Sequence, residues 1–191
     1  MKAIETITGR VSVLNRDDVD TDQIIPKQFL KRVERTGFGE FLFYDWAKED
    51  GWDLPVNPIL ATGPNFGCGS SREHAAWALE DRGFRVVLAP SFGDIFHTNA
   101  IKSGLAPIEL PEEALGAIRD AVAARNELTV DLEAREVSHP GGLRLPFLFD
   151  DYARETLLHG LDDVARTLKR EDRIAAYEAS LAPRFDTRLL A

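Results

Sequence analysis

Residues 67–75, with the sequence GCGSSREHA, gather the side chains in this chain that are best suited to chemistry. In order along the run, the relevant residues are Gly67, Gly69, Ser70, Ser71 and Arg72. The two glycines allow the backbone to come close to a bound group. The hydroxyls and the guanidinium lie where a helical pattern begins, and free N–H groups and the macrodipole at a helix N-terminus favour negative charge. The run therefore predicts a site for a substrate that carries carboxylates.

A purely structural interpretation of the same serine is also open. Ser70 and Glu73 match the S-x-x-E capping box, in which the serine caps a helix and the glutamate reaches back. A cap, however, requires neither two glycines upstream nor an arginine beside two serines. Both interpretations of Ser70 remain possible on the residues alone.

Alternating strand and helix patterns surround this run and must position it. Apolar strand-like runs and helical spacings follow one another in the order 57–63, 72–82, 85–90, 91–103, 105–110 and 111–125. Such alternation favours a parallel or mixed sheet covered by helices, and therefore an α/β fold.

The ends of the chain have different periods. Ile7, Val11 and Val13 alternate as in one half-buried strand, and the segments 128–132 and 143–147 alternate around Pro140-Gly141-Gly142 as in a hairpin. From residue 150 the pattern is helical, with an interruption at Gly160. We expect one domain over residues 1–150 and a helical C-terminal extension, 151–191, packed on it.

Two long connections lie between the first strand and the run 67–75. Residues 17–26 are rich in acids, including Asp22, and end at Pro26; they predict a polar turn that could orient a cation, either an arginine or a metal. Residues 27–53 carry seven aromatic side chains interleaved with glycines and basic residues. They could form a lid that closes over a ligand or a segment that packs in the core, and we expect partial mobility there.

Composition excludes several classes of protein. A net charge of −9 with a pI near 5.0 argues against binding to nucleic acid. The single cysteine, Cys68, permits no internal disulfide and cannot alone hold an iron–sulfur cluster, and the four histidines lack metal-site spacing, so we expect no metal ligands in this chain. No apolar run approaches the ~18 residues that span a membrane, and the N-terminus lacks a signal-peptide core, so a cytoplasmic protein is expected.

Two common classes of enzyme do not fit the run. A serine hydrolase elbow requires G-x-S-x-G, but the residue two before Ser70 is Cys68. A phosphate-binding P-loop requires a lysine before the hydroxyl residue, and that pattern is absent from the sequence.

Three separated blocks carry a resemblance to a known family. They are 20–26 (DTDQIIP), 65–75 (NFGCGSSREHA) and 91–99 (SFGDIFHTN), the last followed by Gly104-Leu105-Ala106-Pro107. In this order the blocks resemble the swivel domain of the aconitase superfamily. The chain length and the tail residues 160–163 are similar to the small-subunit family of bacterial 3-isopropylmalate dehydratases, and the resemblance covers nearly the whole chain.

The resemblance implies a three-layer β/β/α swivel domain that docks on a separate large subunit as a heterodimer or higher complex. That subunit would carry a 4Fe-4S cluster, so this chain would bind no cofactor itself. The implied reaction is a hydro-lyase isomerisation of a small dicarboxylate, 2-isopropylmalate to 3-isopropylmalate, in leucine biosynthesis. Neither nucleic acid nor a membrane is an implied partner.

The resemblance also implies roles for single residues. Ser70 would be the catalytic base that removes a proton from carbon, and Ser71, Arg72 and Arg32 would bind substrate. Gly67, Gly69, Asp22 and His74 would support the site.

The sequence departs from aconitase proper in two places. Cys68 stands where aconitases carry an acid, and the arginine that follows the Asp-rich block has only Arg32 as a candidate counterpart. Three alternatives therefore stay open: a citraconate or methylmalate hydratase subunit, a homoaconitase-like subunit, or a non-catalytic assembly subunit.

Overall fold

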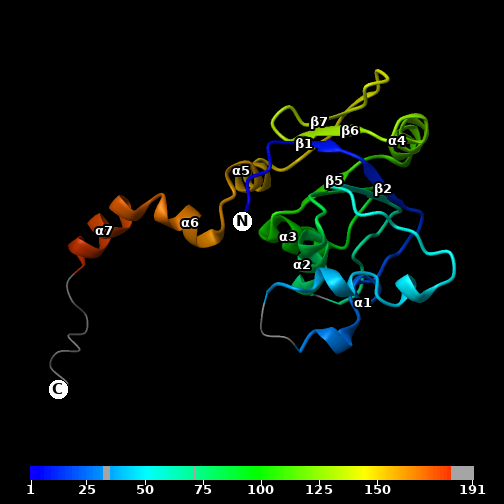
Figure 1. Cartoon of the computed structure of the whole chain (residues 1–191). Coiled ribbons are helices and arrows are strands. Elements are labelled where there is room, and N and C mark those ends of the chain that lie inside the picture. The colour runs from blue at the N-terminus through cyan, green and yellow to red at the C-terminus, as the bar shows by residue number, and fades with distance from the viewer. Residues whose placement is uncertain (32–34, 71, 182–191) are drawn as a thin grey trace. The chain divides into compact units, whose positions relative to one another are not determined.

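The computed structural model describes residues 1–31, 35–70 and 72–181 (Figure 1). The chain divides into two units, Met1–Gly160 and Leu161–Ala191. Within the described residues, no helix combines the length and the apolar character needed to cross a membrane.

A parallel sheet forms the centre of the first unit. Its strands lie in chain order: β2 (Val11–Leu14), β3 (Ile59–Thr62), β4 (Val86–Ala89) and β5 (Ala106–Glu109). Helix α2 (Glu73–Arg82) connects β3 to β4, and α3 (Asp94–Ser103) connects β4 to β5. The predicted alternation of strands and helices around the run 67–75 is confirmed.

A second, antiparallel sheet has the order β1 (Thr6–Gly9), β6 (Leu128–Asp131), β7 (Glu136–Ser138) and β8 (Arg144–Pro146). The single strand predicted over Ile7–Val13 is wrong, because the chain changes sheets after Gly9. A Cβ at Gly9 would lie 2.5 Å from Pro58 Cγ, so a larger residue at this position would have to displace Pro58.

The predicted hairpin around Pro140-Gly141-Gly142 has a different first strand. β7, rather than β6, pairs with β8 across this turn, while β6 lies between β1 and β7. β7 is three residues long, and its one apolar residue, Val137, gives no alternation to detect. The three strands therefore form a meander.

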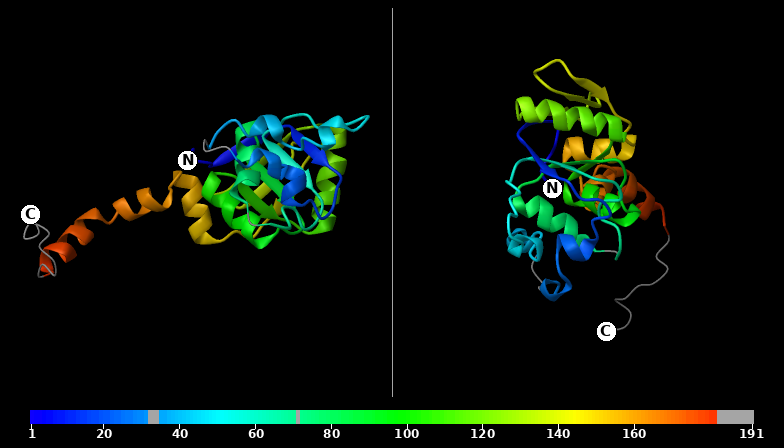
Figure 2. Two further views of the ribbon diagram at one scale, coloured as in Figure 1. Left: turned by 90° about the horizontal axis from the view of Figure 1, so that it is seen from below. Right: turned by 90° about the vertical axis from the view of Figure 1, so that its right-hand side faces the viewer.

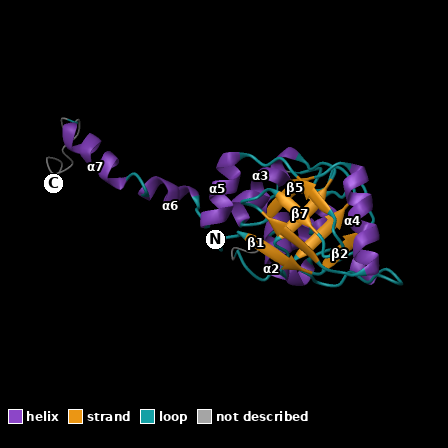
Figure 3. Ribbon diagram, turned by 90° about the horizontal axis from the view of Figure 1, so that it is seen from above, coloured by secondary structure: helices purple, strands orange, loops and turns teal. Residues whose placement is uncertain are grey.

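Two hydrophobic cores hold three layers together. One core lies between the sheets, where Ile59 and Val86 of the parallel sheet meet Leu128 and Val130 of the antiparallel sheet. The other lies on the opposite face of the parallel sheet, against α2 and α3. Figure 1 shows the antiparallel strands, the parallel strands and the pair α2 and α3 in that order, and Figure 3 shows the strands of the two sheets lying over one another. The predicted β/β/α arrangement is confirmed.

The described part of the segment 27–53 packs into the second core (Figure 2, light blue and cyan). It contains three short 3-10 helices: η1 (Lys27–Phe29), η2 (Gly39–Phe41) and η3 (Trp46–Lys48). Phe38 and Phe43 are fully buried, and the Phe43 ring stacks on Trp46. This packing confirms the core interpretation for these aromatics and counts against a lid in the described part of the segment.

The remaining helices are α1 (Thr21–Ile24), α4 (Glu112–Ala124), α5 (Asp151–His159), α6 (Asp163–Leu168) and α7 (Glu171–Ser180). Ala153 and Leu157 of α5 belong to the core between the sheets, so the first unit ends at Gly160, one helix later than the predicted boundary at residue 150. Gly160 ends α5 in the left-handed region, at φ 61°. That the later residues pack on the domain stays a prediction.

Candidate active site

The three blocks of the sequence meet at the carboxyl ends of β2, β3 and β4. Because parallel strands in register end at one edge of a sheet, the loops that follow them lie together. Asp20 pairs with Cys68, and Phe66 pairs with Phe92, as isolated parallel bridges. Gly67 N–H donates to the Val19 carbonyl at 2.8 Å, so the loops are joined through their backbones.

Gly67 and Gly69 are both in the left-handed region, with φ values of 75° and 84°. A Cβ at Gly67 would lie 2.2 Å from the Phe96 ring, and one at Gly69 would lie 1.9 Å from Asp20 Oδ2. The two glycines were predicted to make room for a ligand, but the groups that lie close to them here belong to the protein itself. The glycines therefore allow the three loops to fit together.

Ser70 is exposed and is not a helix cap. Helix α2 begins at Glu73, with Arg72 in the N-cap position at φ −133° and no side-chain cap. The capping box predicted from Ser70 and Glu73 is therefore wrong, because Ser70 lies two residues before the cap. The Ser70 carbonyl accepts a hydrogen bond from Thr21 Oγ1 at 3.1 Å.

Arg72 forms a bidentate ion pair with Asp22 of α1. Its Nη1 donates to Oδ1 and its Nη2 donates to Oδ2, the latter at 3.2 Å. The Arg72 side chain is only 16% exposed, whereas that of Asp22 is 48% exposed. The hydrogen bond from Arg72 lowers the pKa of the Asp22 carboxyl, against an opposing effect of burial. Of the two cations that the acid-rich turn could orient, the structure shows the arginine.

The described residues do not suit a metal ion or a cluster. No group of three or more His, Cys, Asp or Glu side chains among them could hold a metal. Burial, together with Asp20 and Asp18, raises the pKa of the Cys68 thiol, so the thiol is protonated near neutral pH.

His74 lies among aromatic rings on α2. Its ring centroid is 5.1 Å from that of Phe38, edge to face, and 4.7 Å from that of Trp77. Burial lowers the pKa of His74, so its imidazole is neutral near pH 7. Its contact with Phe38 joins α2 to the segment 27–53. That His74 supports the site stays a prediction.

Two predicted substrate-binding residues, Arg32 and Ser71, lie outside the described residues. The roles that the resemblance gives them stay predictions. The other predicted site residues, apart from His74, come together in the loops around Ser70.

Asp20 and Thr21 also contact the loop of Ser70, although neither was predicted as a site residue. Asp20 caps α1, because its carboxylate accepts from Asp22 N–H while Gln23 reaches back to the Asp20 N–H. Thr21 is 1% exposed and bonds to the Ser70 loop through both its backbone and its hydroxyl. The D-x-x-Q spacing at 20–23 was the available signal, since it matches a capping box in which aspartate replaces serine.

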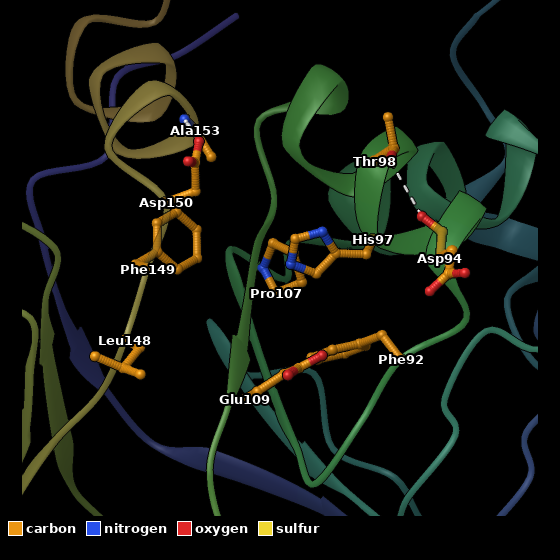
Figure 4. Close-up of a pocket in the computed structure, with 10 residues that line it drawn as sticks. All are labelled: Phe92, Asp94, His97, Thr98, Pro107, Glu109, Leu148, Phe149, Asp150 and Ala153. Carbon is orange, nitrogen blue, oxygen red and sulfur yellow. Dashed lines mark hydrogen bonds between the residues drawn. The ribbon is translucent and has the colours of Figure 1, made fainter.

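A cavity of about 420 Å³ lies at the ends of β4 and β5 (Figure 4). Its lining includes Asp94, Glu109 and Asp150 around His97, with Phe92 and Phe149 as apolar walls. Burial lowers the pKa of His97, against the opposing effect of these three carboxylates. An acidic lining around a neutral imidazole repels a dicarboxylate, so we place no substrate in this cavity.

The chain is similar to known proteins over most of its length. The Aconitase C-terminal domain family matches residues 52–113. The chain is 50% identical to the 3-isopropylmalate dehydratase small subunit of Halalkalibacterium halodurans, over 94% of this chain and 99% of that protein. It is 51% identical to the small subunit of the same name from Koribacter versatilis, over 95% and 100% of the two chains. The crystal structure of 3-isopropylmalate dehydratase from Methanocaldococcus jannaschii is similar with a TM-score of 0.70 and 26% identity, covering 90% of this chain and 99% of that chain.

Proposed function

This chain belongs to the family of 3-isopropylmalate dehydratase small subunits, and on that premise we propose that it provides half of the active site of such an enzyme. The enzyme isomerises 2-isopropylmalate to 3-isopropylmalate in leucine biosynthesis and acts in the cytoplasm. Removal of a carbon-bound proton and of the hydroxyl group on the neighbouring carbon forms water and an alkene diacid. Addition of water to this alkene, with the hydroxyl group now on the other carbon, gives the isomer.

Ser70 is our candidate for the base that takes the carbon-bound proton. This assignment rests on the position of Ser70. The residue is exposed, its carbonyl is held by a hydrogen bond from Thr21, and it precedes Arg72 by two residues. The N-terminus of α2 lowers the free energy of an alkoxide by only about 0.3–1 kcal/mol, less than one pKa unit at about 1.36 kcal/mol each. Ser70 therefore needs further stabilisation from Arg72 and from the partner.

Arg72 is our candidate for binding a substrate carboxylate. A guanidinium has five N–H donors in a planar fork that matches a carboxylate. The bonds to Asp22 come from Nη1 and Nη2, each of which carries a second N–H, and Nε carries another. Asp22 thus fixes the plane of the guanidinium while donors remain for the substrate.

The remaining chemistry must come from another chain. We place the 4Fe-4S cluster that the resemblance implies on the large subunit, because the described residues of this chain lack a ligand set for it. The exposure of Ser70 suits a site that is closed by a partner. The complex would be a heterodimer or a higher assembly.

The test is an anaerobic assay of isopropylmalate dehydration, followed by the absorbance of the alkene. Three samples are compared: the chain alone, the chain with an iron–sulfur large subunit, and that mixture with Ser70→Ala. We expect turnover only in the mixture and near-complete loss with Ser70→Ala. Ser138→Ala, on the antiparallel sheet, is the matched control and should retain activity.

Two outcomes would contradict the proposal. Turnover by the isolated chain would show that it holds a whole active site. Full activity of the Ser70→Ala mixture would make this chain an assembly subunit. Assays on citraconate, methylmalate and homoaconitate in the same mixture distinguish the related hydro-lyases, because a preferred rate on one of them would replace isopropylmalate as the substrate.

A further inference from the structure

We propose that Thr21 is a positioning residue that sets the location of Ser70 by binding its loop from the buried side. The inference rests on the proposed function, since it concerns the base that the function requires. Thr21 does not touch the substrate in this scheme and acts through Ser70.

Thr21 makes two hydrogen bonds to the loop, on either side of Gly69. Its backbone N–H donates to the Cys68 carbonyl at 2.9 Å, and its Oγ1 donates to the Ser70 carbonyl at 3.1 Å. The side chain is buried, so water does not substitute for these bonds as it does on a surface. Together they fix the carbonyl groups of Cys68 and Ser70, the residues on either side of Gly69.

The loop needs such a restraint because its own conformation is permissive. Gly69 has a φ of 84°, in a region that glycine shares with many other backbone states. Ser70 is exposed and lies two residues before the N-cap of α2, so the helix does not fix it. The Asp20 carboxylate lies next to the position that a Cβ at Gly69 would occupy, so a larger residue there would displace this carboxylate.

Helix α1 thereby links the two chemical groups of the half-site. Thr21 binds the Ser70 carbonyl, and the next residue, Asp22, binds the Arg72 guanidinium. α1 is itself held by the capping box of Asp20 and Gln23. Two adjacent residues of one capped turn thus set the separation between the base and the carboxylate-binding group.

The expected effect on catalysis follows from geometry. Displacement of a reacting group by about 1 Å costs up to roughly a hundredfold in rate. Thr21→Val removes the hydroxyl but keeps the shape of the side chain, so we expect kcat to fall by about tenfold to a hundredfold. KM should change by less than about threefold, because the pair of Asp22 and Arg72 is left intact.

The experiment uses the complex with the large subunit and measures kcat and KM for isopropylmalate. Thr21→Ser keeps the hydroxyl and should restore kcat to within about threefold of the parent. Thr62→Val is the matched control: Thr62 is equally buried, and its hydroxyl donates to the Arg16 carbonyl at 3.4 Å. It makes a side-chain bond to a different loop carbonyl and should leave kcat within about twofold.

A double-mutant cycle with Ser70→Ala distinguishes an effect of Thr21 on the position of Ser70 from a nonspecific effect on the structure. If Thr21 acts through Ser70, adding Thr21→Val to Ser70→Ala should lower the residual kcat by less than about twofold. An equal loss in both backgrounds would overturn the inference, and so would parental kcat in Thr21→Val. Full activity of Ser70→Ala alone would instead refute the proposed function, and the two failures are thereby distinguished.

Thermal unfolding and assembly of each variant are measured first. Should Thr21→Val fail to assemble with the large subunit, Thr21→Ala and Thr21→Ser provide the same comparison with smaller side chains. A kcat for Thr21→Ala close to that of Thr21→Ser would then overturn the inference, and a loss confined to Thr21→Ala would support it.

Discussion

At the scale of single residues, the site depends on pairings between loops that are far apart in the sequence. The serine, arginine and glycines of the run 67–75 and Asp22 could all be predicted from the sequence, because their types are characteristic. The contacts of these residues could not be predicted. The glycines make room for Asp20 and Phe96 rather than for a ligand. The acid-rich turn binds an arginine, whereas its composition alone does not distinguish an arginine from a metal ion as the bound cation.

The ion pair of Asp22 and Arg72 predicts a pH dependence of stability. The pKa of Asp22 in the folded chain lies below its ordinary value of about 3.9. The stabilisation is therefore complete above that ordinary value and is lost as pH falls through the folded pKa. Asp22→Asn should lower the free energy of unfolding by less than about 1 kcal/mol at pH 7, because the carboxylate is half exposed, and the difference should vanish in acid.

Urea unfolding of the isolated chain at pH 7 and at pH 3 measures this difference. Arg72→Met supplies the control, since Asp22→Asn should change little once the guanidinium is gone. A stability gap that grows as the pH falls would contradict the assignment of the pKa shift to Arg72.

At the scale of elements, the sequence predicted the parallel sheet and its helices but missed the places where one element changes into another. Alternation over Ile7–Val13 concealed the change of sheet at Gly9, since period 2 continues through it. The aromatics of 27–53 were compatible with a lid or with a core, because packing partners such as α2 are not visible in local spacing. The range predicted for this helix, 72–82, agrees with α2, but the cap was misassigned, because S-x-x-E also occurs where the serine is outside the helix.

The absence of a side-chain cap on α2, compared with the capped start of α5, predicts two different results for two helix-start substitutions. Ser70→Ala should change the free energy of unfolding by less than about 0.5 kcal/mol, as for an exposed side chain that caps nothing. Asp150→Ala should destabilise the chain by about 1 kcal/mol, because the Asp150 carboxylate caps α5 by accepting from Ala153 N–H at 2.9 Å. Equilibrium urea unfolding compares the two, and an equal loss for Ser70→Ala would restore Ser70 as a cap.

At the scale of the whole molecule, the stability of the fold comes from the first unit. All residues that are buried in the described part of the chain lie within Met1–Gly160. From Leu161 to Leu181 the side chains are exposed or half-buried, among them Val164, Leu168 and Tyr177. The helical pattern of these residues was predictable from sequence, whereas what they pack against was not.

This distribution predicts that a chain ending at Gly160 folds on its own. Its free energy of unfolding should lie within about 1 kcal/mol of that of the full chain, since the two cores are complete without the later residues. Urea unfolding with fluorescence of Trp46, Trp52 and Trp77 provides the measurement. Loss of a cooperative transition in the shortened chain would show that residues after Gly160 are needed for the core.

The joining of the loops after β2 and β3 has a consequence for how the protein is made. Thr21 and Ser70 are separated by 49 positions in the chain, and Asp20 meets Cys68 at a similar separation. During synthesis the acid-rich turn is complete long before the strand that brings Ser70 to it, and the entropy of closing a loop of that size must be overcome first. The half-site consequently forms only once β2 and β3 have paired, and a newly made chain that presents it has already assembled these two strands. A partner that binds there would thus discriminate against chains in which this pairing has not formed.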